Sequence, residues 1–180
     1  MKTHIIYIPG LGDRYDGFRR VVLSFWKLWG VSMEYVPITW YDEGSFDEKM
    51  QRIERAVKRA KDRRIVLVGE SAGASLALHG ASRFGVKKVI TLCGVAQSKT
   101  PISNYLRAKA PALHTAASTL PSRYPVPVES LRAFKDGVVG ERWSKTNDAT
   151  VHTIWMVGHM TTIVICLTIL ASLMVTIAKK

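Results

Sequence analysis

The stretch RIVLVGESAGASLALHGA, residues 64–81, limits how this chain can fold more than any other part of the sequence. Residues 65–68 form a short, continuous apolar run rich in β-branched side chains, which is typical of a strand buried on both faces. Residues 72–84 are mostly good helix formers. The stretch therefore predicts a strand, a tight turn and a helix, with Ser71 at the turn.

Glycines stand two positions before and two positions after Ser71. The central residue of a sharp strand-to-helix turn is held in a strained conformation, so its neighbours Gly69 and Gly73 have to be small. Such a turn projects the serine hydroxyl from the end of a sheet, and the first amides of the following helix point toward whatever the oxygen attacks. In this setting GESAG resembles the nucleophile elbow of the α/β-hydrolase superfamily. The alternative is a structural glycine-rich turn in a doubly wound protein of another kind.

Strand and helix patterns alternate along the chain, which predicts crossover connections and a mostly parallel sheet with helices on both faces. The predicted strands are 4–8, 33–38, 65–68, 86–93, 130–134 and 153–157. The predicted helices are 14–29, 48–64, 72–84, 103–109 and 113–120. The first of these helices has an apolar side made of Phe18, Val21, Val22, Phe25 and Trp29.

Prolines punctuate residues 94–127, so we expect a small excursion near the mouth of the site there, with a minimal cap or none. The length of 180 residues suits one domain. The expected fold class is therefore α/β, a single domain with the α/β-hydrolase fold. It divides into a catalytic part, residues 1–159, and an apolar C-terminal helix, residues 160–180.

A serine hydroxyl needs a base to take its proton, and the base needs a third group to fix its orientation. The resemblance implies the chain order serine, carboxylate, histidine. His159 follows the apolar strand TIWMV and a glycine, which is similar to the GH loop of these hydrolases. The remaining histidines fall at strand starts, inside a helix or in the excursion: His4, His79, His114 and His152.

The carboxylate has two candidates. Asp136 opens DGVV after a predicted strand, which resembles the D-x-x-V turn that carries the acid in many lipases and esterases. Asp148, in NDATV, also precedes a valine, but most of the residues between it and His159 belong to a strand. We expect Asp136 to be the third member, and either aspartate also suits an ordinary loop that caps a turn.

The resemblance also implies an oxyanion hole made of two backbone amides. One belongs to Ala72, which follows the serine, and the other to Leu11 in the PGLG loop, where Pro9 stands at a position at which histidine is common. This loop lacks the lysine and the glycine spacing of phosphate-binding loops, so we expect no phosphate there. No metal-ligand spacing occurs either, and we expect neither a metal nor a cofactor.

The formal net charge is +12, and much of the excess lies in the predicted helix 48–64, which a capping box at Ser45 and Glu48 opens. Its apolar residues recur at helical spacing, with basic residues around them: Met50, Ile53, Val57 and Ala60. The basic side is either a solvated surface or a surface that attracts anionic lipid head groups. No nucleic-acid-binding motif accompanies it, so nucleic acid is not an expected partner.

Residues 160–178, MTTIVICLTILASLMVTIA, contain no charged residue. The span is long enough to cross a bilayer. It also suits a helix that covers one face of the sheet, because Thr168, Ser172 and Thr176 recur every four residues as a weakly polar stripe. Both alternatives stay open. With no secretory signal and with Cys93 and Cys166 suited to buried thiols, we expect membrane association with the catalytic part facing the cytoplasm, or else a soluble cytoplasmic protein.

The implied activity is that of a serine hydrolase for ester or thioester acyl groups of a small molecule or a lipid, through an acyl-enzyme. Two alternatives differ in class. One is a catalytically silent module that binds a membrane surface or a partner, and the other is an acyltransferase. The sequence leaves acyl chain length, head group and oligomeric state undetermined.

Overall fold

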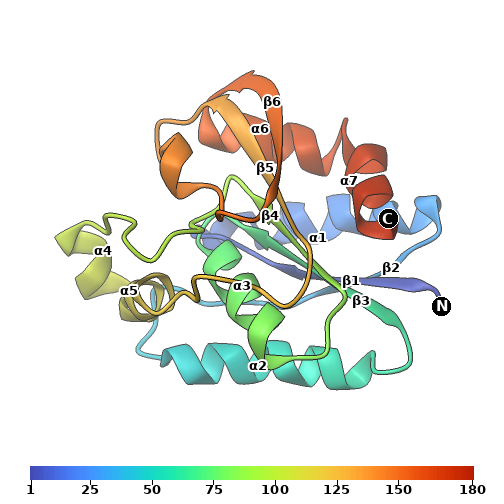
Figure 1. The fold of residues 1–180 in the computed structure, drawn as a ribbon, viewed down its shortest axis with the longest axis horizontal. Helices are drawn as coiled ribbons and strands as arrows, with labels where there is room; N and C mark the ends of the chain where they lie inside the picture. The colour runs from blue at the N-terminus through green and yellow to red at the C-terminus, as the bar shows by residue number, and fades with distance from the viewer.

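The structure, a computed structural model, describes all 180 residues and contains one six-stranded, fully parallel sheet (Figure 1). The strand order is β2-β1-β3-β4-β5-β6. The strands are β1 Thr3–Ile8, β2 Ser32–Tyr35, β3 Arg64–Glu70, β4 Lys88–Leu92, β5 Val128–Lys135 and β6 Thr150–Val157. β2 is shorter than predicted, since Pro37 has no amide hydrogen to continue the ladder.

Helices lie on both faces of the sheet, as the alternating pattern predicts. The α-helices are α1 Asp16–Ser24, α2 Phe46–Arg59, α3 Gly73–Arg83, α4 Asn104–Lys109, α5 Pro111–Ser118, α6 His159–Leu167 and α7 Ala171–Lys179. The 3-10 helices are η1 Asp13–Tyr15, η2 Phe25–Trp29 and η3 Glu141–Trp143. This is the expected fold class.

Two apolar cores separate the layers, because alternate residues of each strand point to opposite faces. Ile6 and Ile8 of β1 belong to a core of 30 buried residues under α2, α3 and α5. Ile5 and Tyr7 belong to a core of 20 buried residues under α1, η2, α6 and α7. In Figure 1 the first set of helices lies below the sheet and the second above it.

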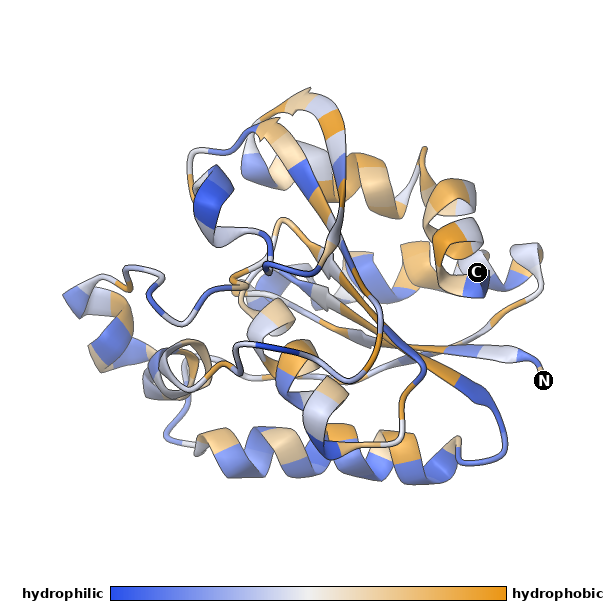
Figure 2. Cartoon of the chain, in the orientation of Figure 1, coloured by the Kyte–Doolittle hydropathy of each residue, from blue (hydrophilic) through white to orange (hydrophobic).

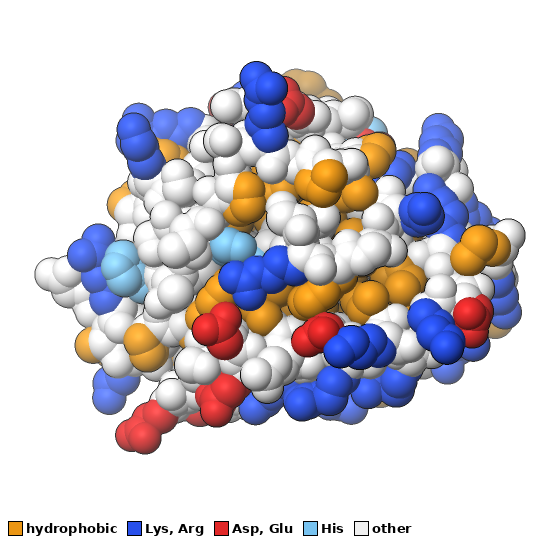
Figure 3. Space-filling model, turned by 60° about the horizontal axis from the view of Figure 1, so that its bottom comes forward, with side chains coloured by type: hydrophobic (Ala, Val, Ile, Leu, Met, Phe, Trp, Pro, Cys, Tyr) orange, Lys and Arg blue, Asp and Glu red, His pale blue; other side chains and the backbone are white.

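Helix α2 presents its apolar side to the larger core and its basic side to solvent. Met50, Ile53 and Ala60 are buried as predicted, and Val57 packs partly buried beside them. The capping box predicted at Ser45 is present, with both of its hydrogen bonds. Figure 3 shows Lys and Arg side chains gathered over this side of the molecule.

The apolar side predicted for residues 14–29 faces mostly solvent, and of its members Val22 packs partly buried against the smaller core. Phe18, Val21 and Phe25 are 45, 61 and 56 % exposed, whereas Leu23 and Trp26 pack in the core. The helical segment carries apolar residues on two opposite sides, and apolar periodicity alone does not decide which of them faces the sheet.

Residues 160–180 form two helices rather than the single helix that the sequence predicts. α6 and α7 meet at a bend of 73°. The indole Nε1 of Trp26 donates to the Leu167 carbonyl oxygen at 2.9 Å, which occupies an acceptor that a continuous helix would offer to the Ala171 amide. That amide bonds to the Thr168 carbonyl oxygen instead.

Both helices cover the sheet, as in the second alternative for this segment. Cys166, Leu167 and Met174 are buried in the smaller core. At the end of α7, Lys88 Nζ donates to the Ile177 carbonyl oxygen at 3.0 Å, and Arg64 donates to that of Ala178. No single helix has the length and apolarity needed to cross a bilayer, and the bent pair meets that test by length and composition alone.

Candidate active site

Ser71 lies between the end of β3 and the start of α3, at the carboxyl edge of the sheet. Its φ is 48°, in the left-handed region that a residue with a side chain rarely adopts. The Ser71 amide donates to the Leu92 carbonyl oxygen at 2.9 Å, which ties the strained residue to the neighbouring strand β4. The strand, turn and helix predicted around this serine are all present.

Steric crowding by the neighbouring backbone requires glycine at both flanking positions. A Cβ on Gly69 would lie 2.5 Å from the Cα of Ala74, and a Cβ on Gly73 would lie 2.3 Å from the carbonyl oxygen of Ile8. Real Cβ atoms essentially never come this close to backbone atoms. The turn therefore has room for its sharp path only because both positions lack a side chain.

Gly73→Ala is expected to lower the free energy of unfolding by about 2–3 kcal/mol, because backbone of β1 and α3 has to move apart. Gly17→Ala is the matched control, since its Cβ meets nothing within 4 Å in α1 and alanine is the better helix former. Urea unfolding of both variants measures the difference. Equal midpoints for the two variants would contradict the close packing described here.

The structure brings His159 and Asp136 to Ser71. His159 begins α6, directly after Gly158, whose φ of 102° turns the chain back toward the serine. Its Nε2 lies 2.9 Å from Ser71 Oγ, and its Nδ1 lies 2.8 Å from Asp136 Oδ2. With the ring proton on Nδ1, the ring donates to Asp136 and accepts from the Ser71 hydroxyl, which is the arrangement that general-base activation of a hydroxyl requires.

Asp136 follows β5 and is fixed by its own turn. Its Oδ1 accepts from the amides of Val138 at 2.8 Å and Val139 at 3.0 Å. Burial by itself would raise the pKa of this carboxyl, but the hydrogen bond from His159 and the two amides outweigh it and hold the pKa below its ordinary value. The side chain, only 5 % exposed, is therefore ionised at neutral pH and can orient the imidazole.

The lowered pKa predicts a pH dependence of stability. A carboxylate with a depressed folded-state pKa stabilises the fold above its ordinary pKa and loses that contribution as the pH falls toward the folded-state pKa. The difference in unfolding free energy between wild type and Asp136→Asn should therefore stay constant above about pH 5 and shrink below about pH 4. Chemical denaturation at several pH values tests this, and a difference that grows with acidity would contradict it.

The other candidates from the sequence lie elsewhere. Asp148 is exposed just before β6, at the amino edge of the sheet opposite Ser71. His79 bonds to the Ala116 carbonyl oxygen at 2.9 Å. His152 bonds to Glu129 at 2.7 Å. None of these contacts brings a side chain to the serine.

The loop after β1 packs directly on the serine turn. A Cβ on Gly10 would lie 2.7 Å from Ser71 Cβ, so the loop approaches as closely as it does only with glycine there. Leu11 follows Gly10 on this loop, and Ala72 follows Ser71 on the turn. The structure therefore brings together the two segments whose amides the sequence suggests as oxyanion donors, and that role remains a prediction.

Sequence reasoning missed Arg19, which ties the loop to the turn. Arg19 is 2 % exposed, and its Nε and Nη2 donate to the two oxygens of Glu70 at 2.8 and 2.5 Å. It also donates to the carbonyl oxygens of Gly12 at 2.9 Å and Leu11 at 3.3 Å. The signal available in the sequence was Glu70 itself, because an acid at the end of a buried strand requires a cation or a donor nearby.

The carboxylate of Glu70 has a further partner in Tyr7 of β1, whose hydroxyl donates to it. Burial first, and then the charge of Glu70, raise the pKa of Tyr7 well above its ordinary value, so the tyrosine stays protonated. For Arg19, burial would lower the pKa, but its bonds to Glu70 raise it, so the guanidinium stays charged. The buried carboxylate of Glu70 is thus paired with one cation, Arg19, and accepts hydrogen bonds from both Arg19 and Tyr7.

One group of metal-type ligand atoms occurs at the site. The ligand atoms of Cys93, Asp136 and His159 lie within 4.8 Å of one another. Burial, followed by the charge of Asp136, raises the pKa of the Cys93 thiol, which opposes the thiolate form that metals prefer. The imidazole and the carboxylate are already bonded to each other. These three residues therefore do not fit a metal centre well.

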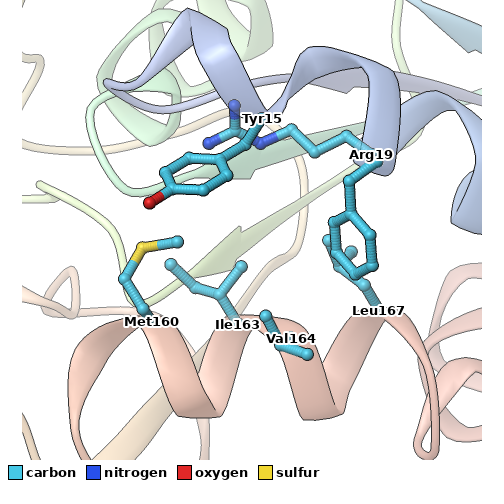
Figure 4. Close-up of a pocket in the computed structure, with 7 residues that line it drawn as sticks. Tyr15, Arg19, Met160, Ile163, Val164 and Leu167 are labelled. Atoms are coloured by element: carbon cyan, nitrogen blue, oxygen red, sulfur yellow. The ribbon is translucent and has the colours of Figure 1, made fainter.

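Two hollows adjoin the site and share Tyr15 and Met160. One, of about 550 Å³, lies over the loop that contains Leu11. The other, of about 450 Å³, is an apolar groove between α1 and α6 (Figure 4). The residues that line this groove are Tyr15, Phe18, Arg19, Met160, Ile163, Val164 and Leu167. Met160, which lines both hollows, directly follows His159 in the chain.

The sequence matches no protein-family model and no curated protein. Solved structures do match its fold. The alpha/beta hydrolase domain-containing protein 10 from mouse has a TM-score of 0.70 at 16% identity, over 98% of this chain and 89% of that one.

Two further solved structures are similar over most of their length. A monoacylglycerol lipase from Paleococcus ferrophilus has a TM-score of 0.65 at 13% identity, over 87% of this chain and 85% of that one. The type II thioesterase BorB from the borrelidin biosynthetic cluster has a TM-score of 0.64 at 16% identity, over 96% and 91%. The chain therefore has the α/β-hydrolase fold.

Proposed function

We propose that this chain is a serine hydrolase that cleaves ester or thioester bonds of acyl substrates, either small molecules or lipids. The observation that carries the proposal is the line of hydrogen bonds from Ser71 through His159 to Asp136, at 2.9 and 2.8 Å. A serine in a strained turn, a histidine within hydrogen-bond reach and an ionised carboxylate behind it are the parts that nucleophilic acyl transfer needs. The lipase and the thioesterase among the structures of similar fold add support for this class of reaction.

In the proposed reaction, Ser71 Oγ forms a bond to the acyl carbon as its proton passes to His159 Nε2. The bond from the acyl carbon to the leaving oxygen or sulfur then breaks, and Nε2 returns the proton to the leaving group. Water repeats the sequence on the acyl-enzyme, releasing the acid and restoring the serine. The amides of Leu11 and Ala72 are the proposed donors to the oxyanion, each worth about 3 kcal/mol to the barrier.

A fluorophosphonate probe tests the proposal directly, because it reacts with activated serines and not with ordinary ones. We expect one probe to attach per chain, and mass spectrometry of the digest should locate it on Ser71. Hydrolysis of p-nitrophenyl esters of increasing acyl length then measures substrate preference. Folded protein that takes up no probe and cleaves no ester would instead indicate a silent binding module.

A further inference from the structure

The outer side of α1 and η2 is an exposed apolar surface that no part of the chain covers. Phe18, Val21, Phe25 and Leu28 are spaced by three or four residues, so they lie along one side of the helical segment. Their exposed fractions lie between 45 and 78 %. Single exposed apolar residues are ordinary, but a contiguous stripe of large ones marks an interaction surface.

Helices α6 and α7 continue this surface on the other side of two grooves. Met160 and Val164 of α6 line the groove of about 450 Å³ together with Phe18 of α1, and in Figure 4 Met160 points toward Tyr15. Ile169 faces Phe25 and Trp29 across a second apolar groove of about 380 Å³, and the two grooves share Leu167. We call this surface, Phe18 to Trp29 together with Met160 to Ile169, the apolar face. Figure 2 shows α6 and the neighbouring helix α7 largely in orange.

Apart from Asp16 at the start of α1, which pairs with Arg19, the charged residues of the elements that form the apolar face are all basic. Residues 17–33 and 149–180, which supply α1 beyond its first residue, η2, α6 and α7, contain no Asp or Glu. Arg20, Lys27, Lys179 and Lys180 are exposed on or next to these elements. None of the four takes part in an ion pair. Lys179 donates to the Trp29 carbonyl oxygen and Arg20 lies over the ring of Tyr35, so none of the four is neutralised by a carboxylate.

We propose that the apolar face binds the surface of an anionic lipid bilayer. Helices that lie in the membrane interface combine an exposed apolar stripe with flanking Lys and Arg, and each basic residue near an anionic surface contributes about 1 kcal/mol. The apolar grooves suit hydrocarbon chains better than a protein surface. A second copy of the chain on the same face would oppose cations to cations with no carboxylate between them, which disfavours a dimer.

This binding places the site next to its supply of acyl groups. The groove between α1 and α6 opens within the apolar face and shares Tyr15 and Met160 with the hollow over the loop of Leu11. A chain entering from the lipid surface would thus reach the loop of Leu11, which packs on the serine turn. Binding to lipid stands independently of catalysis, and only this last consequence rests on the proposed function.

Co-sedimentation of the full chain with vesicles tests the proposal. We expect binding to vesicles of equal parts phosphatidylcholine and phosphatidylglycerol, and little binding to phosphatidylcholine alone. Phe25→Glu with Leu28→Glu should lower the partition coefficient at least tenfold. Lys27→Gln should lower it about fivefold, and added salt should weaken binding.

Tyr105→Glu with Val138→Glu is the matched control. It places the same two charges outside the apolar face, on side chains of similar exposure, 66 and 71 %, so it has the same net charge as the Phe25→Glu, Leu28→Glu variant. It should sediment as wild type does. Circular dichroism checks that each variant is folded. Ser71→Ala should bind vesicles like wild type, so a failure of catalysis and a failure of binding are told apart.

Three outcomes would overturn the proposal. One is equal sedimentation with neutral and anionic vesicles. Another is an unchanged partition of the Phe25→Glu, Leu28→Glu variant. The third is a concentration-dependent dimer in sedimentation velocity that this variant abolishes, which would assign the face to a second copy of the chain.

Discussion

Replacing Ser71 by alanine should reduce kcat/KM for ester hydrolysis by about 10⁵-fold, to the level that binding and oxyanion donors alone provide. In the proposed reaction Ser71 supplies the attacking oxygen, and its hydroxyl is the one that bonds to His159 Nε2. The variant should fold normally, because the change removes only the hydroxyl oxygen and adds no atom to the tightly packed turn. Steady-state rates with a short p-nitrophenyl ester measure the loss.

Ser130→Ala is the control for this measurement. Ser130 is also buried, but its hydroxyl bonds to Thr91 in the neighbouring strand rather than to a histidine. Its replacement should change stability by about 1 kcal/mol and leave the rate within a few-fold of wild type. A Ser71→Ala protein that keeps most of its rate would remove this serine from the mechanism and with it the proposed function.

Replacing Arg19 by methionine should lower the free energy of unfolding by about 3–5 kcal/mol, the typical effect of removing one partner of a buried ion pair. The methionine fills much of the same space but leaves the Glu70 carboxylate, 1 % exposed, with only the Tyr7 hydroxyl. It also releases the Leu11 and Gly12 carbonyl oxygens. Chemical denaturation followed by circular dichroism gives the value.

Arg20→Met is the matched control, one residue along the same helix. Arg20 is exposed and lies over the ring of Tyr35, so its loss should cost no more than about 0.5 kcal/mol. Adding Glu70→Gln to Arg19→Met should recover part of the stability, since no unpaired charge then stays buried. If Arg19→Met and Arg20→Met unfold at the same denaturant concentration, the ion pair does not hold the loop to the turn.

The parts of the fold that the sequence predicts well are those in which several signals coincide. Around Ser71, the apolar strand, the two glycines and the alanine-rich helix all agree with one geometry, and the structure has it. His159 and Asp136 follow strands at their carboxyl ends, and in a parallel sheet those ends share one edge. Chain direction also separates Asp136 from Asp148, because Asp148 precedes its strand and so lies at the opposite edge.

The parts that the sequence predicts poorly depend on contacts between distant residues. Helix α1 has apolar residues on two sides, and the choice between them is made by Arg19, which can reach Glu70 only when its own side faces the sheet. The bend after α6 depends on Trp26, which is 141 residues away from Leu167 in the chain. Neither contact produces a periodic pattern in the local sequence, so a prediction based on neighbouring residues cannot detect it.

The contacts of α7 join residues that are synthesised at very different times. Lys88 and Arg64 emerge from the ribosome long before the carbonyl groups of Ile177 and Ala178 that they finally hold. Until then the smaller core lacks the residues of α7 that complete it, Ala171, Met174, Val175, Ile177 and Ala178. A nascent chain therefore leaves apolar residues on this side of the sheet uncovered until α7 has docked.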